Sequence, residues 1–142
     1  MRAGYLCLYT VADRPGVVRL VDREQAPPGL PAPDDPQLRY VARFKDLDAG
    51  LMHLQTALRR GLVDLNRRLY RTELVRAVAA LEAEELSHER VWIDPTVSAE
   101  AQKRIAALKA VYDRRHRLAN RAWQVAGGLG IALLLFRALG LF

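Results

Sequence analysis

Three histidines are the side chains of this sequence best suited to proton transfer or metal binding. His53 lies on the polar flank of a leucine-rich segment. No second type of metal ligand stands near it in the sequence, so it is either a hydrogen-bonded surface residue or a functional one. His88 stands among glutamates, which fits either a solvated helix end or a metal site. These glutamates are Glu84, Glu85 and Glu89. His116 belongs to a basic run, and we predict no catalytic residue, no metal site and no cofactor from these patterns.

The single cysteine, Cys7, stands in an apolar segment. One cysteine excludes an intramolecular disulfide and the usual cysteine-based zinc sites. Cys7 therefore either packs as a small hydrophobic residue or acts as a nucleophile. A lone cysteine also favours a reducing, cytoplasmic environment.

Five arginines form the one basic cluster in the first hundred residues of the sequence. They are Arg59, Arg60, Arg67, Arg68 and Arg71. The cluster fits either a solvated loop or a docking patch for an acidic protein surface or for phosphates. The sequence contains no glycine-rich phosphate-binding motif and no recognisable Ser-His-Asp set.

The elements that must position these side chains begin with three predicted strands, over residues 4–11, 17–22 and 38–44. In the first strand, alternation places Cys7 on one face and Leu6 on the other. A turn containing proline and glycine joins the first two strands into a hairpin. A loop with five prolines separates the second strand from the third, and this density of proline excludes regular structure.

Helices follow the third strand. A leucine every three or four residues predicts an amphipathic helix that begins after Asp46 or Asp48 and ends near Gly61. The leucines of this stripe are Leu47, Leu51, Leu54 and Leu58. A second helix is predicted over residues 73–89, with Thr72 as its N-cap. The expected fold class is thus α+β, with helices packed on a small three-stranded antiparallel sheet.

Net charge divides the chain into a neutral part and a basic part. Residues 1–100 hold 14 Lys and Arg against 15 Asp and Glu, whereas residues 101–121 carry a net charge of +6. We predict a basic membrane-proximal helix over residues 98–121, with Ser98 as its N-cap. Its basic side chains next to the expected membrane are Arg114, Arg115, Arg117 and Arg121. Because the basicity lies outside the domain over residues 1–97, nucleic acid is not an expected partner of that domain.

Residues 122–142 are apolar except for Gln124 and Arg137. As a helix this stretch would be about 31 Å long, close to the ~30 Å hydrocarbon core of a bilayer. With the basic flank before it, the pattern predicts a transmembrane tail anchor that holds the N-terminal domain on the cytoplasmic side. The alternative is a core helix that is buried on all sides.

Several residues of this stretch carry predicted contacts with lipid or with another subunit. Trp123 stands where an interfacial aromatic residue belongs, and Arg137 is close enough to the end of the stretch to reach the far interface. Gly127, Gly128 and Gly130 would let another helix approach closely. A plain lipid-facing helix is the alternative.

Short motifs in the first part of the chain resemble the GIY-YIG endonuclease-like superfamily. Gly4-Tyr5-Leu6-Cys7 resembles the opening of its first strand, and Val18 to Val21 lies where its second motif falls. The segment around His53 resembles the family helix that carries a histidine, and Leu69-Tyr70 resembles a later aromatic pair. The resemblance covers roughly residues 4–86.

The same resemblance implies that catalysis has been lost. The catalytic tyrosine of the family falls at Cys7, the glycine of the second motif at Val21 and the metal-binding glutamate at Gly50. The segment 25–38 lacks the family's arginine, and only His53 matches. The resemblance therefore implies a degenerate member, a pseudoenzyme that keeps the scaffold.

From these observations we predict a non-catalytic, membrane-anchored interaction protein, an accessory subunit of a larger membrane protein complex. Membrane lipids and the other subunits of that complex are its expected partners. The alternative is a membrane-tethered nucleic-acid-binding or residual GIY-YIG nuclease module. The near-neutral domain and the missing catalytic positions favour the first prediction.

Overall fold

A computed structural model describes residues 1–97 and 99–140 of the chain, so the predicted cap at Ser98 lies outside the described residues. The described strands are β1 (Gly4–Thr10), β2 (Val17–Arg23), β3 (Leu38–Phe44), β4 (Leu62–Asp64), β5 (Leu69–Arg71) and β6 (His88–Ile93). The helices are α1 (Leu47–Leu58), the 3₁₀ turn η1 (Arg59–Gly61), α2 (Leu74–Glu82) and α3 (Ala99–Ala138).

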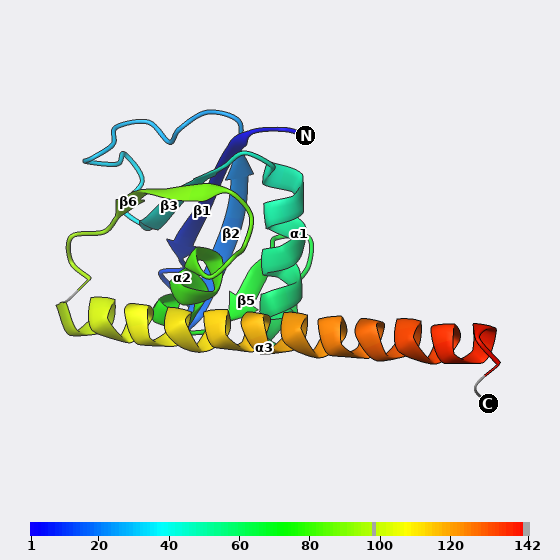
Figure 1. Cartoon of the computed structure of the whole chain (residues 1–142). Coiled ribbons are helices and arrows are strands. Elements are labelled where there is room, and N and C mark those ends of the chain that lie inside the picture. Colours follow the sequence, from blue (N-terminus) through cyan, green and yellow to red (C-terminus); the bar gives the residue numbers. More distant parts are fainter. Residues whose placement is uncertain (98, 141–142) are drawn as a thin grey trace.

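These strands form one antiparallel sheet in the order β4-β5-β2-β1-β3-β6 (Figure 1). The α+β class and the three predicted strands are confirmed, but a three-stranded sheet is wrong, because the described chain adds three strands at its edges. β4 and β5 are only three residues long and pair around a tight turn. There the Asp64 side chain accepts hydrogen bonds from the N–H groups of Asn66 and Arg67, and Arg68 has φ +52°. This turn places β5 against β2.

The predicted helix over residues 73–89 is also wrong, because α2 ends at Glu82 and the chain then returns to the sheet as β6. Glu82 accepts a hydrogen bond from the Tyr40 hydroxyl (3.1 Å) and pairs with Arg90 of β6. His88 stacks on Phe44 with ring centroids 4.9 Å apart. These contacts with β3, distant in sequence, favour a strand over another turn of helix. Residue Glu73, not Thr72, is the N-cap.

The main core lies between the sheet and the helices. Leu6 and Leu8 of β1 face it, and Leu47, Leu54 and Leu58 of α1 are buried against it, as the leucine stripe predicts. The Asp46 side chain caps α1 by accepting a hydrogen bond from the N–H of Ala49 (3.3 Å). Gly50 must stay small because a Cβ there would lie 2.6 Å from the Phe44 ring.

The proline-rich loop covers the other face of the sheet. Cys7, Tyr9 and Val41 are buried there, with Leu30 of the loop packed against them. The indole N–H of Trp92 donates to the carbonyl of Pro31 (3.1 Å), which fastens the loop to β6. Residues two apart on a regular strand share a face, but Leu38 lies on this face whereas Tyr40 lies on the other. The reason is an irregularity in the pairing of β1 with β3, whose register shifts between Leu8 and Tyr9.

α3 runs past α2 and the C-terminal end of α1, and then continues beyond the rest of the chain (Figure 1). Ile105 is the residue of α3 that is buried in the core, and Arg104 pairs with Glu73, the N-cap of α2, at 3.1 Å. The basic segment and the apolar stretch, predicted as two elements, form one helix without a break.

The predicted membrane anchor is wrong. Among the described residues, we find no helix that combines the length and the apolar character needed to cross a membrane. α3 ends at Ala138, and its uninterrupted apolar run lies between Gln124 and Arg137. That run, residues 125–136, is about 18 Å long as a helix, well short of the ~30 Å hydrocarbon core. The transmembrane, tail-anchored and single-pass assignments for residues 122–142 are therefore corrected.

Candidate functional site

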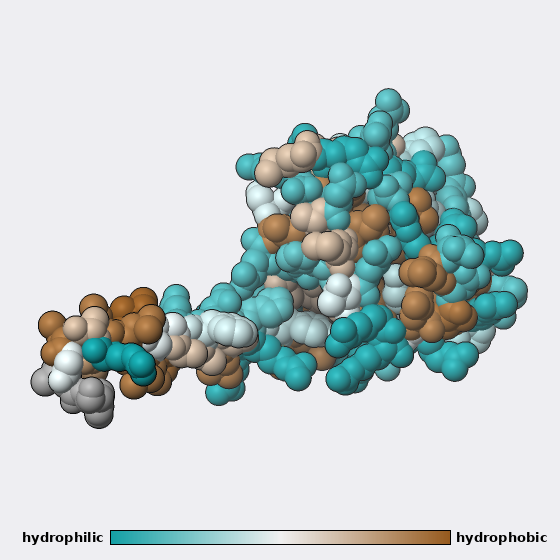
Figure 2. All heavy atoms as spheres, turned by 90° about the vertical axis from the view of Figure 1, so that its right-hand side faces the viewer, coloured by the Kyte–Doolittle hydropathy of each residue, from teal (hydrophilic) through white to brown (hydrophobic). Residues whose placement is uncertain are grey.

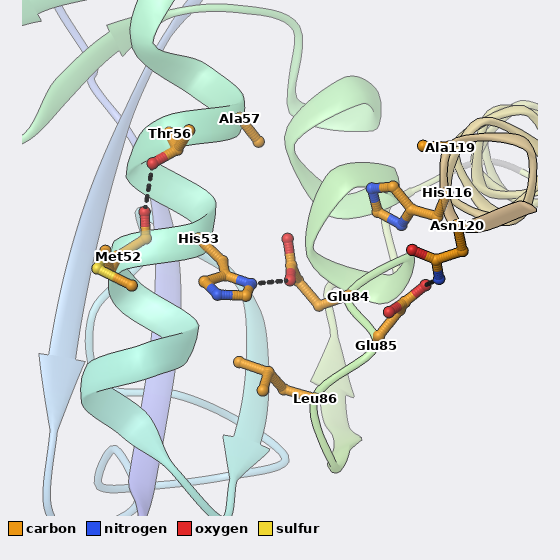
Figure 3. Close-up of a pocket in the computed structure, with 10 residues that line it drawn as sticks. All are labelled: Met52, His53, Thr56, Ala57, Glu84, Glu85, Leu86, His116, Ala119 and Asn120. Carbon is orange, nitrogen blue, oxygen red and sulfur yellow. Dashed lines mark hydrogen bonds and ion pairs between the residues drawn. The ribbon is translucent and has the colours of Figure 1, made fainter. Parts of the chain in front are cut away.

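A groove of about 790 Å³ opens between α1, the segment after α2, and α3 (Figure 3). We call it the α1–α3 groove. Its lining residues are Met52, His53, Thr56 and Ala57 from α1, Glu84, Glu85 and Leu86 after α2, and His116, Ala119 and Asn120 from α3. Six of these ten side chains carry polar groups and four are apolar, so polar groups that could contact a ligand line all three sides of the groove.

A histidine–glutamate pair crosses the groove. His53 Nδ1 lies 3.0 Å from Glu84 Oε2, and Figure 3 shows the two side chains pointing toward one another. The Glu84 side chain is 9% exposed and that of His53 46% exposed. The position of His53 off the leucine stripe is confirmed, but its partner could not be predicted, because Glu84 was expected inside a helix. The turn that ends α2 is what brings Glu84 to α1.

The α3 side of the groove presents His116 and Asn120. Among the described residues, His116 Nδ1 is buried and has no hydrogen-bond partner, while Asn120 donates to Glu85 Oε1 at 3.5 Å. An unpaired buried nitrogen in a groove wall can bind a polar group of a ligand. His116 was expected only as a member of the basic run, and nothing local in the sequence marks it as a wall of this groove.

Two carboxylates are the anionic groups of the groove. Glu84 and Glu85 supply carboxylates, and the described residues contain no group of three or more His, Cys, Asp or Glu placed to hold a metal ion. Thr56 is the one hydroxyl in the lining, and it donates to the carbonyl of Met52 at 2.9 Å. An ammonium or guanidinium group fits such carboxylates.

Cys7 and His88 have structural roles. Cys7 is fully buried, and this burial raises the pKa of its thiol to about 12. A thiol with so high a pKa is a poor nucleophile at neutral pH. His88 lies on β6, where its Nδ1 is 2.6 Å from the carbonyl of Leu86 and its ring stacks on Phe44. It therefore does not lie at the solvated helix end that the sequence predicts.

The five clustered arginines are split between two places. Arg59 and Arg60 form η1, whereas Arg67, Arg68 and Arg71 lie in or beside the β4–β5 turn. Arg68 pairs with Asp22 of β2, and Arg67 approaches Asp64 at 3.9 Å. Part of the predicted docking patch is thus engaged in holding the sheet edge together.

Large hydrophobic side chains lie exposed along the outer part of α3. We call residues 122–139 the α3 arm. Figure 2 shows its hydrophobic side chains gathered on the projection away from the domain. Trp123 is 77% exposed and Leu134 69% exposed. At the predicted contact glycines, Gly127, Gly128 and Gly130, an added Cβ would meet no described atom within 4 Å apart from the local backbone of α3 itself. The predicted contact residue Arg137 occupies the last turn of α3, and Arg114, Arg115, Arg117 and Arg121 precede the arm.

Comparison with protein-family models, with curated proteins and with solved structures finds no match to this chain. The resemblance to the GIY-YIG superfamily therefore gains no support from them and stays a prediction.

Proposed function

We propose that this chain is a non-catalytic interaction protein that assembles with another protein chain through the α3 arm. The observation that carries the proposal is the exposure of the arm's apolar side chains. They include Trp123, Val125, Leu129, Ile131, Leu133, Leu134 and Leu135. Contiguous apolar surface of this kind marks an interaction site in most proteins. Covering one leucine side chain contributes about 1.5–3 kcal/mol, so a few of these residues suffice for stable assembly.

The arm favours a protein partner because of its length and sequence. An apolar run of about 18 Å, limited by Gln124 and Arg137, matches the length of an ordinary packed helix. Gly127 and Gly130 each cost a helix in water about 1 kcal/mol relative to alanine. Their presence is understandable if another backbone packs closely against them.

The non-catalytic part of the proposal rests on the surroundings of His53. The resemblance to the GIY-YIG family places its catalytic tyrosine at Cys7 and its metal-binding glutamate at Gly50, and both of these residues are buried and lack the catalytic group. His53 instead pairs with Glu84. This arrangement supports a structural or binding role for the histidine.

The test is site-specific photocrosslinking in the cells that produce the protein. A photoreactive amino acid at Leu133 should give a discrete protein adduct, and Leu134→Gln in the same chain should abolish it. The same probe at Gln102, which is exposed on the domain end of α3, is the matched control and should give none. If Leu133 and Gln102 give the same adducts, or none, the arm is not an assembly surface and the proposal is wrong.

A further inference from the structure

We infer that the partner of the α3 arm is a second copy of this chain, bound antiparallel so that its Arg137 enters the α1–α3 groove. This inference rests on the proposed function, since it names the occupant of the same surface. It combines two observations: the pattern of residues along one side of α3, and the two carboxylates, Glu84 and Glu85, in the groove at the base of the arm.

One side of α3 is complementary to itself. The groove-lining residue Asn120 fixes which side this is, because 3.6 residues per turn continue it along the arm. The residues on this side are Asn120, Trp123, Gly127, Gly130, Leu134 and Arg137, at intervals of three and four. When two such helices run antiparallel and cross between Gly127 and Gly130, Gly127 of one faces Gly130 of the other. Trp123 then faces Leu134, and Asn120 faces Arg137.

Each of these pairings is physically favourable. Glycines at the crossing point let the backbones approach, and no described atom occupies the space where their Cβ atoms would be. Trp123 and Leu134, both largely exposed in the single chain, cover one another on either side of the crossing. Antiparallel packing also keeps the two basic segments 101–121 at opposite ends, whereas parallel packing would place them side by side.

The charges at the ends of the pairing are complementary. From the crossing point, Arg137 and Asn120 are each about 13 Å along the helix, so Arg137 of the second copy arrives level with Asn120. Asn120 is hydrogen-bonded to Glu85, and Glu84 lies in the same groove. A guanidinium within an apolar stretch of helix thus meets the carboxylates of the groove. The contact occurs twice, once in each groove, as a two-fold symmetric interface requires.

The experiment is the molar mass of the purified full-length chain in sedimentation equilibrium. The 16.0 kDa chain should behave as a dimer with a dissociation constant in the micromolar range or below. Gly127→Leu should weaken dimerisation about tenfold or more, because the added side chain separates the helices on both sides of the crossing. Gly128→Leu is the matched control: it makes the same chemical change one residue off the contact side and should leave the constant within about threefold.

A charge exchange tests the groove. Arg137→Glu and Glu85→Arg should each weaken the dimer, and the double variant should recover most of the affinity. Oxidation of Gly127→Cys/Gly130→Cys should yield a covalent dimer, whereas Gly128→Cys should not.

A monomeric wild-type chain would overturn this inference, as would equal effects of Gly127→Leu and Gly128→Leu. In that case an adduct at Leu133 that contains a different protein still supports the proposed function. The two ideas fail on different measurements.

Discussion

The ion pair between Arg39 and Asp94 fastens the end of β6 to β3, and removing its charge should measurably destabilise the protein. Arg39 Nη1 lies 2.5 Å from Asp94 Oδ2, and the N–H of Thr96 donates to Asp94 Oδ1 at 2.9 Å. The Asp94 side chain is 8% exposed and that of Arg39 is 29% exposed. Asp94→Asn keeps the shape of the side chain but loses the charge-assisted hydrogen bond. We expect a loss of about 2 kcal/mol in the free energy of unfolding at pH 7, since Arg39 keeps some water and its bond to the Pro36 carbonyl.

The loss of stability caused by Asp94→Asn should become smaller as the pH falls. Burial alone would raise the pKa of Asp94, but the hydrogen bonds from Thr96 and the charge of Arg39 outweigh it and lower the pKa below its ordinary value of 3.8. A carboxyl whose pKa is lower in the folded state stabilises the protein fully above the unfolded pKa. That contribution is lost as the pH falls through the folded pKa. The difference between the wild-type chain and Asp94→Asn should therefore be largest at neutral pH and shrink below about pH 3.8.

Urea unfolding followed by circular dichroism at a fixed protein concentration measures this difference. At pH 7 the midpoint of Asp94→Asn should fall by about 1 M, given a typical slope of about 2 kcal/mol per M. Asp13→Asn is the control: Asp13 lies exposed in the β1–β2 turn, and the change there should stay within about 0.5 kcal/mol. A midpoint for Asp94→Asn equal to that of Asp13→Asn would refute the reasoning. So would a loss that is the same at pH 3 and pH 7.

Two further predictions concern the buried faces of the sheet. Leu54→Ala should lower the free energy of unfolding by about 2–5 kcal/mol, because Leu54 is fully buried. The control is Leu65→Ala, at a side chain that is 64% exposed; it should change the free energy of unfolding by less than about 0.5 kcal/mol in the same urea assay. Equal losses would mean that Leu54 is not packed in the core. In the folded chain, Cys7 should not react with a thiol reagent such as dithionitrobenzoate at pH 8, because burial hides the sulfur and raises the pKa of the thiol to about 12. Once urea unfolds the chain, the same thiol should react. Rapid reaction of the folded chain would contradict the described position of Cys7.

Elements defined by local sequence could be predicted. The β1–β2 hairpin follows from its turn, in which Gly16 has φ +79°. α1 follows from the spacing of its leucines and from its cap at Asp46. The unbroken α3 follows from a sequence without an internal proline. In each case residues within a few positions of one another supply the stabilising contacts.

The membrane prediction failed although the helix itself was predicted. Composition indicated a long apolar stretch, but a membrane span depends on where the helix ends and which charges it includes. The described helix ends at Ala138 and contains Gln124 and Arg137, so its apolar part is too short. The predicted span of residues 122–142 includes both polar residues, with Arg137 expected to reach the far interface.

By itself, the sequence determined the local elements: the hairpin, the leucine-striped α1, the placement of Cys7 and Leu6 on opposite faces of one strand, and an apolar helix at the C-terminal end. Only the tertiary structure decided the edges of the sheet and the groove. The first half of β6, His88 to Arg90, is polar, and it becomes a strand because β3 offers it hydrogen bonds, with Phe44 opposite His88. The α1–α3 groove joins residues that are separated by more than sixty positions, and the short turn after Glu82 brings Glu84 to His53. Such contacts depend on the packing of whole elements, which the spacing of residues along the chain does not encode locally.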